Sequence, residues 1–331
     1  MLVKSGTYFV YGVMKIFLLL LTFLLSSCSM PEIGNIVNSF VSGDRIIPAM
    51  TRCDVLSRDR IRISFSEEIS VNEVKINGSA PSWHLEDPST VLITCHEKLS
   101  VSEPCDLFIR VSDKAFNSTA VRMKLYGRNE EIPELYINEF SSRGTETQPD
   151  RIELEVHTKG NTEGLCVMDG TKGYENHSYI LPSIDVKVGD YIVIFWDAEG
   201  EDEITVNEDG SRVINLYAHS GETLASNNGV FVLYDTASGN GEILDAFVYT
   251  NGETTSYSGF GSRQVEASYN QLRNEFAWLS DAFNSKEATS TRSVCRRLGS
   301  HDTNTKTDFY ICTTRGETFG YPNTSEEYVP Q

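Results

Sequence analysis

The chain has 331 residues, with 28 Lys and Arg against 47 Asp and Glu, and its formal net charge at pH 7 is −19. From Cys28 onward, 26 basic residues face 47 acidic residues, a net charge of −21. Such a surface repels the phosphate backbone of nucleic acids, whose binding depends on Lys and Arg, so nucleic acid is not expected as a partner. The length suits about two domains, and the composition is that of a soluble protein with a packed core.

Residues 1–27 have the pattern of an export signal. Lys15 precedes an apolar run, Phe17 to Leu25, that is too short to cross a hydrocarbon layer of about 30 Å. The run ends in Leu25-Ser26-Ser27-Cys28, which resembles the bacterial lipobox. The resemblance implies that the thiol of Cys28 accepts a diacylglycerol and that fatty acyl chains such as palmitate anchor the protein. A plain signal peptide and a buried strand are the alternatives, and the start is Met1 or Met14.

Acylation of Cys28 predicts a membrane-anchored lipoprotein, in the periplasm or on the cell surface, with the outer membrane favoured. Membrane lipid is then the first partner, and residues 28–44 form a tether. In such a compartment disulfides are permitted. Two sets of three cysteines remain, and an odd number in each module prevents complete pairing within a module. The first set is Cys53, Cys95 and Cys105, and the second is Cys166, Cys295 and Cys312. Isolated buried thiols are the favoured interpretation.

From Arg45 the sequence alternates between apolar and polar residues, as half-buried β-strands do. Strands are predicted at residues 60–65, 71–76, 91–95, 105–111 and 121–125. About seven short strands in this module predict a small β-sandwich. The stretches RISFSEEIS and VSDKAFNS resemble the bacterial Ig-like domain, through Phe65, Ser66, Glu67, Ile69, Asp113 and Asn117. The predicted Ig-like domain covers residues 45–127.

A charged linker at 128–134 leads to a larger module, 135–323, and a tail at 324–331. Residues 135–140 are predicted as an edge-forming strand. The next strand alternates Ile152, Leu154 and Val156 with charged residues at 151, 153 and 155. This alternation predicts a half-buried strand with one charged face.

Five ordered segments of this module resemble the lamin-tail domain family. They are Asn138-Glu139 with the strand at 151–156, Leu181-Pro182 with 188–194, Asn227 to Asp235 with Asp245 to Tyr249, Ser293 to Arg296 with Asp302 and Asp308, and Thr314 to Asn323. Arg151 stands where that family has an aromatic residue. The resemblance implies an immunoglobulin-like sandwich with a binding or scaffolding role and no activity.

Two stretches distinguish this copy. Val265, Tyr269, Leu272, Phe276 and Leu279 recur at helical spacing and predict a short helix near residues 262–275 that packs on the sandwich. Residues 197–209 are strongly acidic and predict a solvated loop or an extended hairpin tip. Five of their carboxylates form a candidate calcium site, because Ca²⁺ prefers hard oxygen ligands. These are Asp197, Glu199, Glu201, Asp202 and Glu203.

We expect no enzymatic activity. No G-x-S-x-G turn for a Ser nucleophile occurs, and the six histidines are scattered without an H-E-x-x-H pattern. The sequence therefore predicts an all-β protein of two immunoglobulin-like β-sandwiches in tandem, serving non-enzymatic binding or scaffolding in the envelope. Contacts with an unknown protein or glycan partner are expected on loops 141–149, 197–211 and 235–242. The alternative is an accessory module that positions an extracellular hydrolase or nuclease.

Overall fold

The computed structural model describes residues 45–239, 241–299 and 301–330, which are mostly β-structure with one short α-helix. This confirms the predicted fold class. Contacts group the chain into two compact units, one of residues up to 53, 62–93 and 107–123, and one of 54–61, 94–106 and 124–331. The predicted signal peptide, the tether and Cys28 lie outside the described residues. Within these ranges, no helix is long and apolar enough to cross a membrane.

Seven strands, most of whose residues belong to the first unit, form two sheets with the orders β1-β2-β5-β4 and β3-β6-β7. Each sheet buries one face. Ile61 and Ile63 are completely buried on β2, as are Ile109 and Val111 on β6. The strands are β1 (Met50–Val55), β2 (Arg60–Phe65), β3 (Ser70–Ile76), β4 (Ser82–Asp87), β5 (Thr90–Thr94), β6 (Cys105–Ser112) and β7 (Ser118–Leu125). The predicted alternation thus produces the small sandwich.

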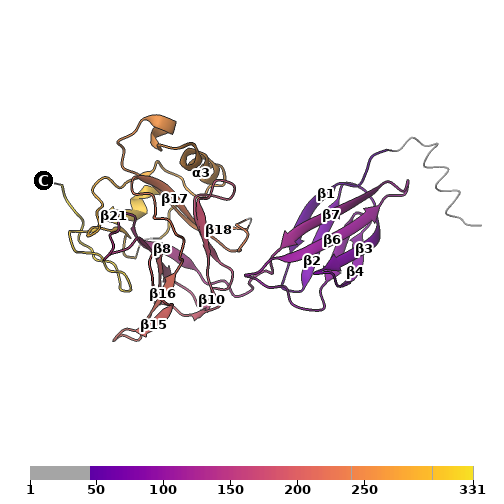
Figure 1. Ribbon diagram of the computed structural model, residues 1–331, viewed down its shortest axis with the longest axis horizontal. Helices are drawn as coiled ribbons and strands as arrows, with labels where there is room; N and C mark the ends of the chain where they lie inside the picture. The colour runs from indigo at the N-terminus through magenta and orange to yellow at the C-terminus, as the bar shows by residue number, and fades with distance from the viewer. Residues whose placement is uncertain (1–44, 240, 300, 331) are drawn as a thin grey trace, which may run out of the picture. The chain divides into compact units, whose positions relative to one another are not determined.

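The second unit holds fourteen strands in two main sheets and a short two-stranded one (Figure 1). The seven-stranded sheet has the order β15-β16-β14-β9-β8-β20-β21, the five-stranded sheet β12-β11-β17-β18-β19, and β10 pairs with β13. The strands are β8 (Leu135–Ser141), β9 (Arg151–Val156), β10 (Gly160–Asn161), β11 (Cys166–Asp169), β12 (His177–Ile180), β13 (Asp185–Val186), β14 (Tyr191–Phe195), β15 (Glu203–Val206), β16 (Arg212–Tyr217), β17 (Asn228–Tyr234), β18 (Ile243–Thr250), β19 (Phe283–Asn284), β20 (Val294–Arg296) and β21 (Phe309–Ile311).

The core of the second unit lies between its two large sheets and is rich in aromatic rings. Phe140 of β8 contacts Phe231 of β17 and Phe247 of β18, with ring centroids 4.9 and 5.5 Å apart. Phe247 in turn lies 4.6 Å from Phe309 of β21. Tilted ring pairs at these distances add to the stability gained from burial alone. The inner face of β9, with Ile152 and Leu154, closes the same core.

The seven-stranded sheet differs from the sequence prediction in two respects. β8 is paired on both sides, with β9 and β20, so the prediction of an edge-forming strand is wrong. The charged face of β9 is also only partly open to water, because Glu153 has no exposed surface, while Arg151 and Glu155 are half-buried. Residues 317–323, which we call the C-terminal strap, cover that outer face, and the backbone N–H of Gly320 donates a hydrogen bond to Glu153.

The predicted helix is present as α3 (Arg263–Asn274), beside β17 (Figure 1). It begins after Ser262, whose hydroxyl accepts a hydrogen bond from the backbone N–H of Val265 at 3.2 Å, as N-cap side chains do. Leu272 is completely buried, and Val265 and Tyr269 pack against the core.

The predicted apolar stripe fails beyond the helix end. Phe276 has a positive φ of 60° and its side chain is 75% exposed, and Leu279 is 52% exposed. The chain turns after Asn274, so the helical spacing no longer places these side chains on one face. Trp278, which the stripe does not include, is the residue that becomes fully buried.

We expect Trp278→Ala to lower the free energy of unfolding by about 3–5 kcal/mol, because it empties a buried aromatic site beside Phe247 and Phe309. Leu279→Ala is the matched control and should change it by no more than about 0.5 kcal/mol. Chemical denaturation of both variants measures the difference. Equal effects would contradict this packing.

Candidate functional site

A buried polar network joins the outer face of the seven-stranded sheet to the C-terminal strap. The side-chain amide of Asn138 donates to Glu153 at 2.7 Å, and that of Asn323 donates to Asn138 at 2.9 Å. Asn323 also donates to the backbone carbonyl of Arg296 at 2.8 Å. Residues far apart in sequence, at the beginning and end of this module, therefore meet in one network.

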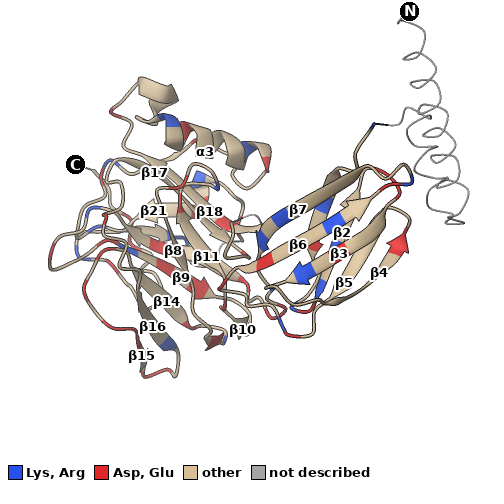
Figure 2. Ribbon diagram, turned by 45° about the vertical axis from the view of Figure 1, so that its right-hand side comes forward, with Lys and Arg blue, Asp and Glu red and all other residues tan. Residues whose placement is uncertain are grey.

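Two glutamates lie next to each other in this network, Glu139 on β8 and Glu153 on β9. Figure 2 marks the acidic residues of this sheet in red. Burial raises the pKa of Glu139, although hydrogen bonds from Ser293 and Thr318 act in the opposite direction. Burial, and then the charge of Glu139, raise the pKa of Glu153 well above its ordinary value. Thr318 donates from its backbone N–H and its hydroxyl to Glu139, each at 3.0 Å. The strap therefore supplies donors that two buried carboxylates require.

The strap also fixes the surroundings of a pocket. The guanidinium of Arg151 lies 4.0 Å from the ring centroid of Phe319 on the strap and 5.9 Å from that of Phe195 on β14. The side-chain amide of Gln148, in loop 141–149, donates to Glu317 at 3.3 Å. A shift of the strap would therefore displace both Arg151, at the start of β9, and Gln148, in loop 141–149.

This pocket, which we call the loop pocket, has a volume of about 720 Å³. It lies where loop 141–149 and the loop after β14 come together, so two of the three loops predicted to carry contacts share one site. Eleven residues line it: Gly144, Thr145, Glu146, Pro149, Asp150, Phe195, Asp197, Ala198, Glu199, Tyr217 and Thr223. The third predicted loop, 235–242, lines a different pocket.

One wall of the loop pocket is aromatic. Phe195 and Tyr217 are paired across the parallel strands β14 and β16, and their rings stack with centroids 4.8 Å apart at 10°. Gly200 lies so close to the Tyr217 ring that a Cβ atom there would collide with it. Asp202 accepts a hydrogen bond from the backbone N–H of Tyr217 at 3.0 Å. The acidic loop thus packs on the aromatic pair and holds it in place.

Acidic side chains supply the remaining polar character. Glu146, Asp197 and Glu199 are exposed at the pocket, and no Lys or Arg is among the described residues that line it. Asp150 is buried, and its two carboxylate oxygens accept hydrogen bonds from the backbone N–H groups of Gly144 and Leu224 at 2.6 and 2.9 Å. Burial raises the pKa of Asp150. Asp150 therefore shapes the loops, whereas the other three acids are available to a ligand.

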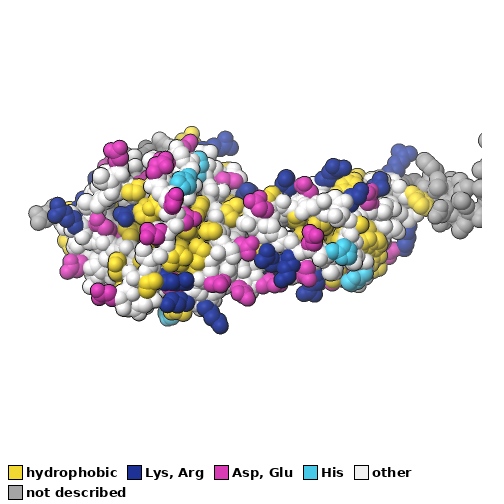
Figure 3. Space-filling model, turned by 60° about the horizontal axis from the view of Figure 1, so that its bottom comes forward, with side chains coloured by type: hydrophobic (Ala, Val, Ile, Leu, Met, Phe, Trp, Pro, Cys, Tyr) yellow, Lys and Arg dark blue, Asp and Glu magenta, His cyan; other side chains and the backbone are white. Residues whose placement is uncertain are grey.

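The charge of the pocket matches that of its module. Residues 128–331 contain 34 of the 47 Asp and Glu and 15 of the 28 Lys and Arg, so they carry the whole net charge of −19. Figure 3 shows one face of this part, with hydrophobic side chains gathered between acidic ones.

The five residues of the candidate calcium site do not converge. Asp197 and Glu199 line the loop pocket, Asp202 binds the backbone of Tyr217, and Glu203 begins the exposed strand β15. β15 pairs with β16, which confirms the hairpin alternative for this stretch. Among the residues with described positions, no group of three or more His, Cys, Asp or Glu could hold a metal ion.

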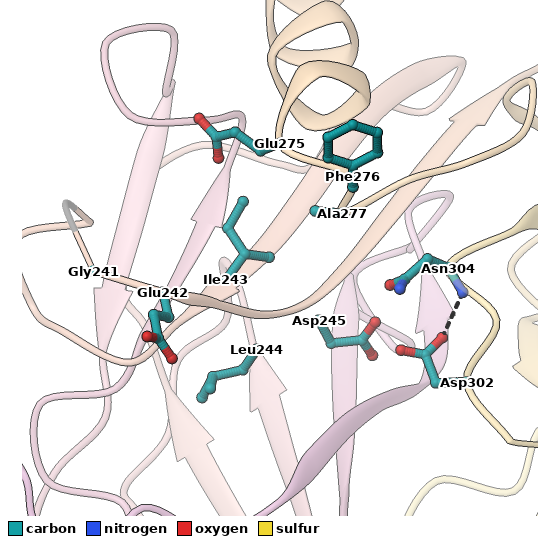
Figure 4. A pocket seen from close by; sticks show the side chains of 10 residues that line it. All are labelled: Gly241, Glu242, Ile243, Leu244, Asp245, Glu275, Phe276, Ala277, Asp302 and Asn304. Atoms are coloured by element: carbon teal, nitrogen blue, oxygen red, sulfur yellow. Dashed lines mark hydrogen bonds between the residues drawn. The ribbon is translucent and has the colours of Figure 1, made fainter.

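The second pocket, of about 420 Å³, lies between the loop before β18 and the turn after α3 (Figure 4). Asp245 at its floor pairs with the buried Arg296 at 2.6 Å, and burial raises the pKa of Asp245 to about 6. Asp302 binds Arg296 at 3.2 Å and accepts the backbone N–H of Asn304 at 3.0 Å. These polar groups satisfy one another, so the loop pocket is the better candidate for a ligand.

No acid–histidine pair lines either pocket within the described ranges. His157 pairs with Glu155 at 3.3 Å and His177 with Glu222 at 2.9 Å, outside both pockets. The sequence predicts both loops of this pocket and two of its acids, Asp197 and Glu199, but it does not predict Phe195 and Tyr217. A signal existed, because each aromatic residue is the last residue of its strand.

The two buried carboxylates should make stability depend on pH. Because folding raises the pKa of Glu153, the folded state holds its proton at pH values where the unfolded chain has released it. The stabilisation is therefore complete below the ordinary glutamate pKa of about 4.3 and is lost as pH rises toward the raised value. We expect Glu153→Gln to flatten the fall in unfolding free energy between about pH 4 and 7, by up to about 1.4 kcal/mol per pH unit.

Glu208→Gln removes the same charge from an exposed position and is the control. Urea titrations at constant ionic strength across this pH range measure the slopes. Identical slopes for the two variants would contradict the raised pKa.

Comparison with known proteins assigns the second module to a family. Residues 133–311 match the family TP_1001_2nd, described as a protein second domain, and these 179 residues are more than half of the 331-residue chain. No curated protein matches the sequence. A DUF4785 family protein from Legionella pneumophila subsp. pneumophila is 13% identical, with a TM-score of 0.20, over 59% of this chain and 54% of that one. The chain thus spans about half the length of that protein. By its match over residues 133–311, the chain belongs to the TP_1001_2nd family.

Proposed function

We propose that this protein is a membrane-anchored lipoprotein with a non-enzymatic binding or scaffolding role in the cell envelope, and that the loop pocket is its binding site. The observation that carries the proposal is the combination of a stacked aromatic wall with exposed carboxylates in one cavity. Cavities that combine an apolar wall with a few polar groups are the usual form of a ligand site.

The chemistry of the pocket favours a ligand with a positive charge on an apolar body. Glu146, Asp197 and Glu199 attract a cation, and the module around them is strongly acidic. The rings of Phe195 and Tyr217 offer an apolar surface beside these charges. Lys or Arg side chains of a partner protein have both properties.

The resemblances to the lamin-tail and bacterial Ig-like families support this role, because they imply binding or scaffolding modules. In the second module, several positions that carry the lamin-tail resemblance lie in the buried network, including Asn138, Glu139 and Asn323. These residues hold the module together, and the ligand contacts are left to the surrounding loops, which vary more readily in sequence. The Ig-like module would space the binding module from the membrane.

An accessory module that positions a hydrolase or nuclease would also bind a protein partner. Capture of such an enzyme through the loop pocket would select that alternative.

We expect the full chain, purified in detergent, to bind a short Lys- and Arg-containing peptide, with affinity that falls as salt rises. The double variant Asp197→Asn/Glu199→Gln should bind about tenfold more weakly, a loss of about 1.4 kcal/mol for two charges. Glu201→Gln/Glu208→Gln removes the same charge outside the pocket and is the matched control. Calorimetric titration measures both.

Two results would contradict this site: equal weakening by the two double variants, or no preference for the basic peptide over its lysine-acetylated form. Binding of a neutral oligosaccharide that both variants retain would assign the pocket to glycans instead.

The membrane anchor has its own test. Growth with a fatty-acid analogue should label the wild-type protein and leave Cys28→Ala unlabelled, because the thiol accepts the lipid. Label that persists in Cys28→Ala would contradict acylation at Cys28. It would not bear on the peptide titration, which tests the loop pocket.

A further inference from the structure

We propose that Cys295 and Cys312 form a disulfide bond that fastens the beginning of the C-terminal segment to the seven-stranded sheet. Both thiols are completely buried, and with Tyr310 they form a small cluster apart from the main core. In the structure both are free buried thiols, as expected, but the two lie together and are not isolated from each other.

The geometry brings the two sulfur atoms together. Cys295 pairs with Tyr310 across the antiparallel strands β20 and β21. The backbone N–H of Cys312 donates to the carbonyl of Ser293 at 3.1 Å, which continues the same ladder by one pair beyond Val294 and Ile311. Residues two apart on a strand face the same side, so both thiols lie on one face. The hydroxyl of Ser293 is 3.6 Å from the sulfur of Cys295 and 3.2 Å from that of Cys312.

The two thiols differ in pKa. The hydrogen bond with the neighbouring thiol of Cys295 lowers the pKa of Cys312 despite its burial, and Ser293 adds to this effect. The same contact with Cys312, together with burial, raises the pKa of Cys295. In the folded arrangement Cys312 is therefore the more acidic of the two thiols.

The third cysteine of this module lies in a different place and is an internal control. Cys166 is completely buried on β11, in the five-stranded sheet, and burial raises its pKa to about 12. One pair and one remaining thiol account for the odd number of cysteines in the module.

The reaction uses a protein disulfide of an export-compartment oxidase. The thiolate of Cys312 attacks one sulfur of that disulfide and expels the other as a thiolate. Cys295 loses its proton and attacks the sulfur of Cys312 in the mixed disulfide, which releases the second thiolate of the oxidase. The oxidase gains two electrons and two protons as a dithiol, and the chain loses them. Since both sulfurs are completely buried in the folded chain, the exchange with the oxidase takes place before this part of the module has finished folding.

The bond would close a ring of 18 residues, from 295 to 312, and its end lies five residues before the strap begins at Glu317. Cross-links of this kind restrict the unfolded chain. Here the restricted part is the segment that must reach Glu139 and Glu153.

The proposal rests on the export part of the proposed function. Full-length protein from cells is alkylated in denaturant without reductant, digested with trypsin and analysed by mass spectrometry. Trypsin separates the two cysteines into peptides 293–296 and 307–315. We expect these peptides to be joined and Cys166 to be alkylated. In a second arm, reduced protein is refolded with glutathione disulfide.

A joined pair in protein from cells supports the proposal. Alkylated Cys295 and Cys312 in both arms overturn it. A bond found only after refolding with glutathione disulfide shows that the bond does not form in the cell, which overturns the proposal and counts against export. The peptide titration tests the loop pocket independently of this result.

Thermal unfolding gives an independent readout. Refolding under reducing conditions should lower the midpoint of wild type by about 6–12 °C, the shift for a ring of this size in a module of this length. Cys166→Ser should show the same shift, and Cys312→Ser should show none. Equal sensitivity to reductant in all three proteins would contradict the bond.

Discussion

Two carboxylates without access to water, Glu139 and Glu153, govern the architecture of the second module. They are neighbours on adjacent strands, so each raises the cost of charging the other, and burial adds to that cost. Such groups are tolerated only when donors surround them. The strap provides those donors through Thr318 and Gly320, and in doing so it covers the face of the sheet that a two-layer sandwich would leave open.

The candidate site depends on this cover. Arg151 is held between the rings of Phe319 and Phe195, and a second contact joins loop 141–149 to the strap through Glu317. The strap therefore positions the aromatic wall and one acidic loop of the loop pocket. Cys312 lies just before the strap in the chain, and Cys295 lies on β20, which pairs with the strand that leads to it. A bond between them would limit how far the strap can move from the sheet. The fold and the pocket thus depend on the same segment, and the proposed cross-link lies just before it.

Much of the fold could be predicted from the sequence, because an alternation of period two requires only that one face of a strand be buried. The residues of β2 and β9 and the helix α3 follow from such patterns. What covers the second face has no periodic signal: the strap is an irregular segment, and its role depends on contacts with residues more than 160 positions away. For the same reason Glu153 looked solvent-exposed in the sequence. The loops of the pocket could be placed by topology, whereas Phe195 and Tyr217 have the same apolar character as buried strand residues.

The strap is an integral layer of the module, held by the buried glutamates. Amide hydrogen exchange at Thr318 and Gly320 tests it most directly, because both N–H groups donate to these carboxylates. We expect both amides to be protected to about the same degree as those of β9, because opening the strap would expose the buried outer face of the sheet. Exchange at the rate of an unstructured peptide, while β9 remains protected, would contradict it.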